Sequence, residues 1–274
     1  MKIQQIYTLF YSATGNTEKV ANALTEYIGE WKVPVQRVNI ASLKEREKKR
    51  LFQNDTLVIV GTPVYAGRIP NKMLPYFQTM LEGNGALAVP VVTFGNRAYD
   101  NALIELKNEL EKHGFHTVAG MAMPSEHAFS DKLATGRPDE SDLSLIQCFA
   151  KEVMEKIETL QEPSKGQISM PGDEVIKGYY TPLGIDGKPA DFLKAKPKTD
   201  MDLCIHCEIC SAVCPMGSIS RQEPDQVEGI CVKCQACIKK CPVGAKYFDD
   251  AAFLSHVKML EENYTRRMEA KFFI

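Results

Sequence analysis

The sequence has no hydrophobic run long enough to cross a membrane. A transmembrane helix needs about 20 consecutive, mostly apolar residues, and no segment of the 274-residue chain approaches that length. The first ten residues are interrupted by Gln4 and Gln5, and no small-residue cleavage site follows them, so they do not form a typical signal peptide. We therefore expect a cytoplasmic protein with no membrane partner.

Neither sign of charge is in excess. The 33 Lys and Arg residues nearly balance the 35 Asp and Glu residues, the formal net charge is −2, and no long basic tract is present. This composition predicts no nucleic-acid partner. The densest charged run, residues 44–50, mixes both signs and indicates a solvated helix face.

Several common catalytic and nucleotide-binding signatures are also missing. We find no Ser-His-Asp set and no pair of histidines at metal-ligating spacing. The glycine turn at residues 12–17 lacks the lysine of a Walker A loop and the three-glycine spacing of a dinucleotide-binding loop. The lack of a pyridine-nucleotide fingerprint argues against an autonomous NAD(P)H oxidoreductase.

Cysteine, in contrast, is concentrated in one short region. Eight of the nine cysteines lie between Cys204 and Cys241, in two runs with the same C-x2-C-x2-C-x3-C-P spacing. This spacing holds [4Fe–4S] clusters, and in two-cluster proteins the fourth cysteine of each run binds the other cluster. The predicted ligand sets are Cys204, Cys207, Cys210 and Cys241 for cluster 1, and Cys231, Cys234, Cys237 and Cys214 for cluster 2.

Zinc sites and disulfides are the two other uses of so many cysteines. Pairs of cysteines two residues apart build four-thiolate zinc sites, but such a site leaves the third cysteine of each triplet unexplained. Disulfides belong to oxidising compartments. We therefore favour clusters and keep zinc as the alternative. The ninth cysteine, Cys148, is expected to be a small buried residue.

The first 162 residues alternate short apolar strands with amphipathic helices. The sequence predicts strands over 3–10, 33–39, 56–60, 86–94 and 115–123, and helices over 16–30, 41–52, 70–82, 98–113 and 141–161. Several of these strands are almost continuously apolar, as in parallel sheets that are covered on both faces. Five such units predict a doubly wound α/β sheet.

The remaining residues divide into three parts. Proline and glycine interrupt residues 163–200, which we interpret as an interdomain connector whose Tyr179, Tyr180 and Phe192 pack against the protein. Residues 201–249 form the cysteine domain, an internal duplication. Apolar residues at helical spacing predict a helix over 250–274. Its apolar stripe either packs on the chain's own domains or forms a surface for a homodimer or another partner.

A hydroxyl-rich turn follows the first strand. Ser12, Thr14, Gly15, Asn16 and Thr17 offer hydroxyls, backbone amides and a helix start to one anion, which is more than a helix cap requires. Two further loops carry glycine and tyrosine at the ends of the third and fourth strands. Their candidate residues are Pro63, Val64, Tyr65, Ala66 and Gly67 in one loop, and Gly95, Asn96, Arg97 and Tyr99 in the other.

The 12–17 turn resembles the phosphate loop of flavodoxins, and the cysteine runs resemble those of bacterial two-cluster ferredoxins. The whole chain is similar to bacterial flavodoxin–ferredoxin fusion proteins. This resemblance implies a flavodoxin-like five-stranded parallel sheet in the order 2-1-3-4-5, followed by a small α+β ferredoxin domain. It also implies that residues 12–17 bind the phosphate of FMN and that the two tyrosine loops flank the flavin ring.

Two features depart from the resemblance. Glu208 stands where ferredoxins usually have small residues, and this change either alters the cluster potential or affects a partner contact. His206 beside it either tunes the potential or fills the loop. The loop 124–140 is longer than a β–α turn needs, and is either a lid over the flavin or a surface loop.

The expected cofactors predict the function. A flavin handles two electrons and a cluster handles one, so we expect an electron-transfer protein that links FMN to two [4Fe–4S] clusters, with redox proteins as partners. The alternative is an FMN-dependent reductase of a quinone, nitro compound or disulfide. A redox sensor is a third, less supported reading.

Overall fold

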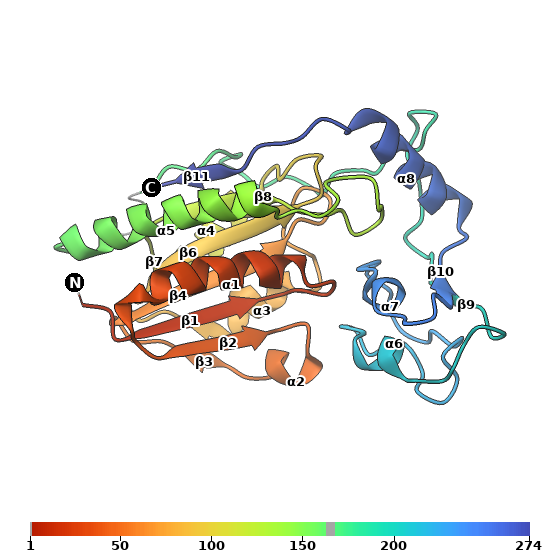
Figure 1. The fold of residues 1–274 in the computed structure, drawn as a ribbon, viewed down its shortest axis with the longest axis horizontal. Coiled ribbons are helices and arrows are strands. Elements are labelled where there is room, and N and C mark those ends of the chain that lie inside the picture. Colours follow the sequence, from red (N-terminus) through yellow and green to blue (C-terminus); the bar gives the residue numbers. More distant parts are fainter. Residues whose placement is uncertain (1, 163–167) are drawn as a thin grey trace.

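The computed structural model describes residues 2–162 and 168–274. Its main body is a sheet with helices on both faces (Figure 1). The parallel strands are β1 (Gln5–Phe10), β2 (Val35–Asn39), β4 (Thr56–Pro63), β6 (Leu87–Phe94) and β8 (Gly120–Pro124). They pair in the order β2-β1-β4-β6-β8. Counted along the chain this order is 2-1-3-4-5, so the flavodoxin-like α/β fold is confirmed.

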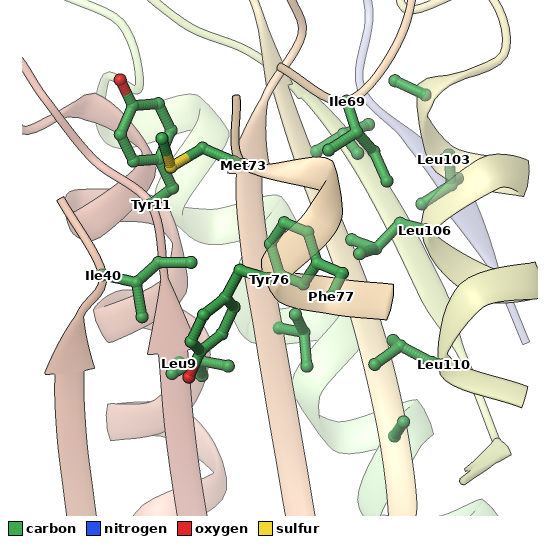
Figure 2. Packing of buried hydrophobic residues seen from close by; sticks show 14 of the residues in the cluster. Leu9, Tyr11, Ile40, Ile69, Met73, Tyr76, Phe77, Leu103, Leu106 and Leu110 are labelled. Carbon is green, nitrogen blue, oxygen red and sulfur yellow. The ribbon is translucent and has the colours of Figure 1, made fainter. Parts of the chain in front are cut away.

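Two pairs of helices cover the sheet. The elements are α1 (Asn16–Ile28) and α5 (Glu140–Thr159) on one face, and α3 (Leu74–Thr79) and α4 (Ala102–Lys112) on the other (Figure 1). Strand β6 is buried along its whole length because both of its faces are covered. Figure 2 shows how Phe77 and Leu106 project from the helices into the core between α3, α4 and the strands. No helix among the described residues is long and apolar enough to cross a bilayer.

The helix predicted over residues 41–52 is mostly wrong. Residues 41–52 instead contain the short helix α2 (Leu43–Arg46) and the strand β3 (Arg50–Leu51). The other short elements of this part of the chain are η1 (Gly29–Trp31), β5 (Leu81–Glu82) and β7 (His116–Thr117). Strand β3 pairs with β5 through backbone hydrogen bonds of 2.8 Å from Arg50 to Met80 and from Phe52 to Glu82. The Arg50 side chain is buried, and a buried cation requires partners. Its guanidinium donates to the hydroxyls of Tyr7 and Tyr76. The charged run is therefore not simply a solvated helix face.

The carboxyl-terminal segment is the largest departure from the predicted fold. Helix α8 (Ala251–Asn263) begins as predicted, with the Asp250 carboxylate accepting a hydrogen bond of 2.8 Å from the Phe253 amide. The predicted helix over 250–274 is wrong beyond Asn263. The chain there becomes extended and adds β11 (Lys271–Phe273) antiparallel to β8, so the sheet has an additional edge strand. The short strand β7 also joins the sheet by pairing with β6, so the predicted count of five strands is wrong and the described sheet has seven.

Aromatic residues fasten α8 and the connector to the body of the protein. Phe253 on α8 packs against Phe192 of the connector, with ring centroids 5.5 Å apart. The rings of Tyr179 and Tyr180 lie under the guanidinium groups of Arg68 and Arg97, at 4.6 and 4.2 Å. The prediction that these connector aromatics pack against the protein is confirmed. Residues 163–167 of the predicted connector lie outside the described residues.

The cysteine-rich region forms a small α+β unit beyond the carboxyl ends of the strands (Figure 1). Its elements are β9 (Lys198–Thr199), α6 (Ile209–Ala212), α7 (Ala236–Lys239) and β10 (Lys246–Tyr247). Strands β9 and β10 pair antiparallel, and the two short helices contact each other. This unit therefore lies at the edge of the sheet where flavodoxin-like folds bind their ligand.

The tail strand makes the first testable prediction. Phe272 on β11 packs against Phe149 on α5, with ring centroids 5.0 Å apart. Phe272→Ala should lower the free energy of unfolding by about 2 kcal/mol, less than for a fully buried phenylalanine. The exposed neighbour Lys271 provides the control, since Lys271→Ala should change it by less than about 0.5 kcal/mol. Guanidinium denaturation followed by circular dichroism measures both, and equal effects would contradict a packed tail.

Candidate functional site

The turn after β1 presents a row of backbone amides. Among the described residues, no acceptor receives a hydrogen bond from the amides of residues 13–17. Gly15 has φ 107°, a left-handed conformation that glycine adopts readily. The turn is held from behind, where the Ser12 hydroxyl accepts from the Glu18 amide and the Ser12 amide donates to Asn39 Oδ1, both at 3.1 Å. Free amides at a helix start suit a phosphate group.

Two of the predicted phosphate residues use their side chains elsewhere. Thr17 is buried, and its hydroxyl shares a hydrogen bond of 2.7 Å with the hydroxyl of Thr93 on β6. Asn16 Nδ2 donates to the Glu126 carbonyl at 2.9 Å. These side chains position the turn, so their backbone amides remain for an anion. The Thr14 hydroxyl has no partner among the described residues.

The two tyrosine loops meet each other at the carboxyl ends of β4 and β6. Tyr65 and Arg68 exchange two backbone hydrogen bonds of 2.9 and 3.1 Å around Ala66 and Gly67, whose φ angles are 47° and 80°. A Cβ on Gly67 would lie 2.4 Å from Asp100 Oδ2, so only glycine allows this approach. The loops therefore form one continuous wall next to the amide-lined turn, with Pro63 and Val64 at its base.

Two predicted residues of the second loop hold other segments of the chain. Asn96 is buried and holds the segment that follows α8. Its side chain accepts from the Met268 amide at 3.3 Å and donates to the carbonyl groups of Tyr264 and Arg266. Arg97 lies over the ring of Tyr180. Tyr99 remains partly exposed at the wall. Sequence reasoning could not assign these anchoring roles, because the partners lie far along the chain.

Tyr11 is a residue of this site that sequence reasoning missed. It is fully buried between β1 and the amide-lined turn, and its ring lies edge-on to Tyr65 at 6.2 Å. Figure 2 shows it beside Met73 at one end of the core. Burial, followed by the nearby Cys234, raises the pKa of Tyr11 well above its ordinary value. Burial and Tyr11 raise the pKa of Tyr65 in the same way, so both phenols stay protonated.

The eight clustered cysteines line two cavities. Cys204, Cys207, Cys210 and Cys241 line the first, which we name the outer site, and Cys214, Cys231, Cys234 and Cys237 line the second, the inner site. Each site combines three cysteines of one run with the last cysteine of the other. This grouping matches the predicted crossover. The prediction that Cys148 is buried is wrong, because Cys148 is exposed on α5.

The donor set of these cavities fits a cluster better than a zinc ion. A four-thiolate zinc site needs four sulfurs about 2.3 Å from one point. Among the described residues, no three Cys, His, Asp or Glu side chains are grouped closely enough to hold one ion. A cubane presents its four irons at separate corners, so its sulfur ligands stand further apart.

The two sites differ in their surroundings. Residues 201–209 around the outer site are exposed except Cys204, which is partly exposed, whereas residues 233–237 of the inner site are buried. Cys234 belongs to the same apolar cluster as Tyr11, with Tyr65 packed against it. The inner site therefore faces the amide-lined turn and the tyrosine wall.

Polar contacts fix the cysteine-rich unit against the sheet. The Arg46 guanidinium on α2 donates to the Pro215 carbonyl next to the inner site. Lys239 on α7 pairs with Glu126 at 3.0 Å and Asp131 at 2.5 Å, both in the loop after β8. These contacts were not predicted, because charged surface residues carry no signal of a distant partner.

The loop 124–140 is held on several sides. Asn16 and Lys19 on α1 donate to its carbonyl groups at 2.9 and 2.7 Å, and its Ser130 donates to Glu261 on α8 at 2.7 Å. Contacts from α1, α7 and α8 therefore make this loop a bracket between the sheet, the cysteine-rich unit and α8.

His127 places this bracket directly against the second tyrosine loop. A Cβ on Gly95 would lie 2.2 Å from its imidazole ring. Its Nδ1 accepts a hydrogen bond of 3.0 Å from the Phe129 amide. Burial lowers the pKa of His127 to about 4, so the ring is neutral at pH 7. His127 was not predicted as a site residue, and only its place after the fifth strand could have indicated it.

Comparisons with known proteins agree with this geometry. A family model described as flavodoxin matches residues 9–151, and a model described as 4Fe-4S binding domain matches residues 197–220. The first model implies FMN, and the second implies at least one 4Fe–4S cluster. No curated protein matches the chain.

Several solved structures are similar to a little over half of this chain. A flavodoxin from the domain Archaea is 16% identical, with 56% of this chain and 99% of that chain covered and a TM-score of 0.41. A Streptococcus pneumonia flavodoxin is 20% identical, with 56% and 99% covered and a TM-score of 0.40. Rubredoxin oxygen:oxidoreductase from Desulfovibrio gigas is 16% identical, with 57% and 37% covered and a TM-score of 0.39. Because the flavodoxin model spans more than half of the sequence, the chain belongs to the flavodoxin family and carries in addition a 4Fe–4S ferredoxin motif.

Proposed function

We propose that this protein is an electron-transfer flavoprotein that links FMN to two [4Fe–4S] clusters. The observation that carries the proposal is the contact of the inner cysteine loop with Tyr11 and Tyr65, beside the amide-lined turn. When bound, the clusters exchange single electrons and FMN exchanges one or two. We propose domain limits of 1–162, 163–200, 201–249 and 250–274.

The amino-terminal site fits the chemistry of FMN. The free amides of residues 13–17 and the Thr14 hydroxyl offer only donors to a phosphate group. Tyr65 and Tyr99 supply aromatic surface at the adjoining wall, where Tyr65 suits stacking on a flavin ring. We propose that these groups hold FMN, together with the backbone of Gly67 and Gly95.

The cysteine sites fit one cluster each. Each cavity offers four thiols and no histidine in the ligand positions. Burial raises the pKa of Cys234 and Cys237 to about 12, so these thiols release their protons when a metal binds rather than beforehand. The second cluster is our proposal, supported by the second four-cysteine cavity.

The outer site offers access to a redox protein. Around it, Leu203 and Ile205 are 51% and 60% exposed, and Tyr247 is 41% exposed. Residues 201–209 contain two acidic side chains, Asp202 and Glu208, and no Lys or Arg. An apolar patch with an acidic rim suits a protein partner with a basic rim.

A carrier is favoured over a small-molecule reductase. A reductase needs a flavin face that a substrate can reach, and the loop 124–140 lies against Gly95 of the second tyrosine loop, where we propose that the flavin binds. Contacts with α1, α7 and α8 hold this loop in place. The chain thus brings its redox sites together and turns the outer one toward solvent, as a carrier between protein partners requires.

Removing the phosphate from the flavin tests the amide-lined turn. FMN should bind at least about tenfold more tightly than riboflavin, because hydrogen bonds to a charged group contribute about 1.5–3 kcal/mol each. Quenching of flavin fluorescence in the flavin-free protein measures both affinities. Gly15→Ala meets no atom within 4 Å but strains the backbone at φ 107°, so it should weaken FMN binding and leave riboflavin binding unchanged. Equal affinities for the two flavins would contradict the assignment.

Iron content tests the two cysteine sites. Anaerobically purified protein should hold about eight iron atoms, and Cys234→Ser or Cys207→Ser should each reduce this to about four. Cys148→Ser provides the matched control, since this cysteine lies on α5 away from both sites, and its iron content should not change. Two zinc ions in place of iron would refute the cluster assignment.

A further inference from the structure

The duplicated cysteine loops share one backbone conformation. His206 and Glu208 of the outer loop have φ angles of 51° and 59°, and their counterparts Lys233 and Gln235 of the inner loop have 55° and 65°. Positive φ angles are uncommon outside glycine. Their repetition at both pairs of positions shows that the loops are built alike, so the sites differ here in side-chain chemistry alone.

Hydrogen bonds to the sulfurs are also duplicated. Cys214 Sγ accepts from the Ser218 amide at 3.4 Å, and Cys241 Sγ accepts from the Ala245 amide at 3.3 Å. Each donor lies four residues after its cysteine. Such bonds influence cluster potential. Cys231 of the inner site accepts a further one, from the Lys233 amide at 3.4 Å, and this backbone bond does not depend on the side chain at position 233.

Charge does distinguish the two loops. Lys233 is buried, and its ammonium group donates to the carbonyl groups of Cys231, at 3.1 Å, and Leu193. Gln235 is buried and neutral, whereas its counterpart Glu208 is exposed and carries a negative charge. Between its first and third cysteines, the inner loop (231–237) therefore has one Lys more and one Glu fewer than the outer loop (204–210).

A second cation reaches the inner site from the sheet. Arg46 donates to the Pro215 carbonyl, directly after Cys214. Arg46 and Lys233 therefore lie near two ligands of the inner set, Cys214 and Cys231. Two cations line the outer cavity, Lys246 and Arg221. Lys246 is buried but acts on a cysteine of each site, and Arg221 is exposed, so water and salt screen its charge.

We propose that Lys233 and Arg46, with a neutral Gln235, make the inner site easier to reduce than the outer site. This inference rests on the proposed function, because it requires a cluster in each site. Reduction adds one negative charge, which a nearby cation stabilises and the Glu208 carboxylate opposes. No bond breaks and no proton moves, and the electron comes from a one-electron carrier protein at the outer face. The first electron then resides on the cluster of the inner site, which is nearer to the proposed flavin site.

Burial of the inner site acts against this order, because a low-dielectric environment disfavours added charge. The same burial leaves the attraction of Lys233 and Arg46 largely unscreened by water and salt. The carboxylate of Glu208 is exposed and more strongly screened. The inner cations therefore provide the larger effect.

Exchanging the paired side chains tests the order. The outer exchange is the double variant His206→Lys, Glu208→Gln. The inner exchange is the double variant Lys233→His, Gln235→Glu. Anaerobic potentiometric titration followed by electron paramagnetic resonance measures the reduction of each site. Each site should give one reduction wave with its own midpoint potential. The outer exchange should raise only the lower midpoint potential, and the inner exchange should lower only the higher one. We expect at least a tenfold change in the reduced-to-oxidised ratio, which equals 59 mV for one electron.

Control variants separate this inference from folding effects. Lys258→Gln removes a lysine charge on α8, where the side chain is 65% exposed, and should shift neither wave. Arg46 lies on α2, outside the cysteine loops, and Arg46→Gln should also lower the midpoint potential of the upper wave. Because His206 and Glu208 are exposed, the outer exchange remains decisive if the inner exchange fails to fold. An outer exchange that shifts the higher midpoint potential, or shifts neither, would overturn the inference, as would a single transition in which both clusters are reduced together. Uptake of fewer than two electrons by the clusters would refute the proposed function instead.

Discussion

The burial of the inner cysteine loop against Tyr11 and Tyr65 is the contact on which the rest of the structure depends. Without it, the cysteine-rich unit would be a separate module that meets the sheet only by diffusion. Burial removes water from both sides, as the raised pKa values of Tyr11 and Cys234 reflect. It also turns the inner site away from solvent and leaves the outer site to meet a partner. One contact therefore gives the two cysteine sites different roles.

The other segments maintain that contact. Lys239 pairs with the loop after β8, Arg46 reaches across from α2, and Asn96 holds the tail that continues from α8. Each of these contacts is modest individually, since partly exposed ion pairs contribute about 1 kcal/mol or less. Together they restrict the relative motion of the two units. Because the units are already in place, electron transfer between them does not require the entropy loss of a diffusional encounter.

Local pattern predicted much of this arrangement, and long-range contacts explain what it missed. Continuous apolar runs predicted the parallel strands, and cysteine spacing predicted which cysteines share a cavity. The burial of Arg50 was missed because it depends on the hydroxyls of Tyr7 and Tyr76. Helical spacing continued past Asn263, but pairing with β8 outweighs local preference there. Tyr11 looked like an ordinary strand residue because nothing local marks the loop that covers it.

The two cysteine loops share one backbone conformation, but they differ in burial because only the inner loop packs against the sheet domain. A charged side chain at the Gln235 position would be buried without a partner, which proteins avoid, whereas Glu208 remains in water at the outer site. The same burial selects Lys233, whose long stem packs while its ammonium group finds two carbonyl groups. The charge difference is thus a consequence of where each loop lies. The contact that joins the units therefore also sets the electrostatic difference along the path of the electrons.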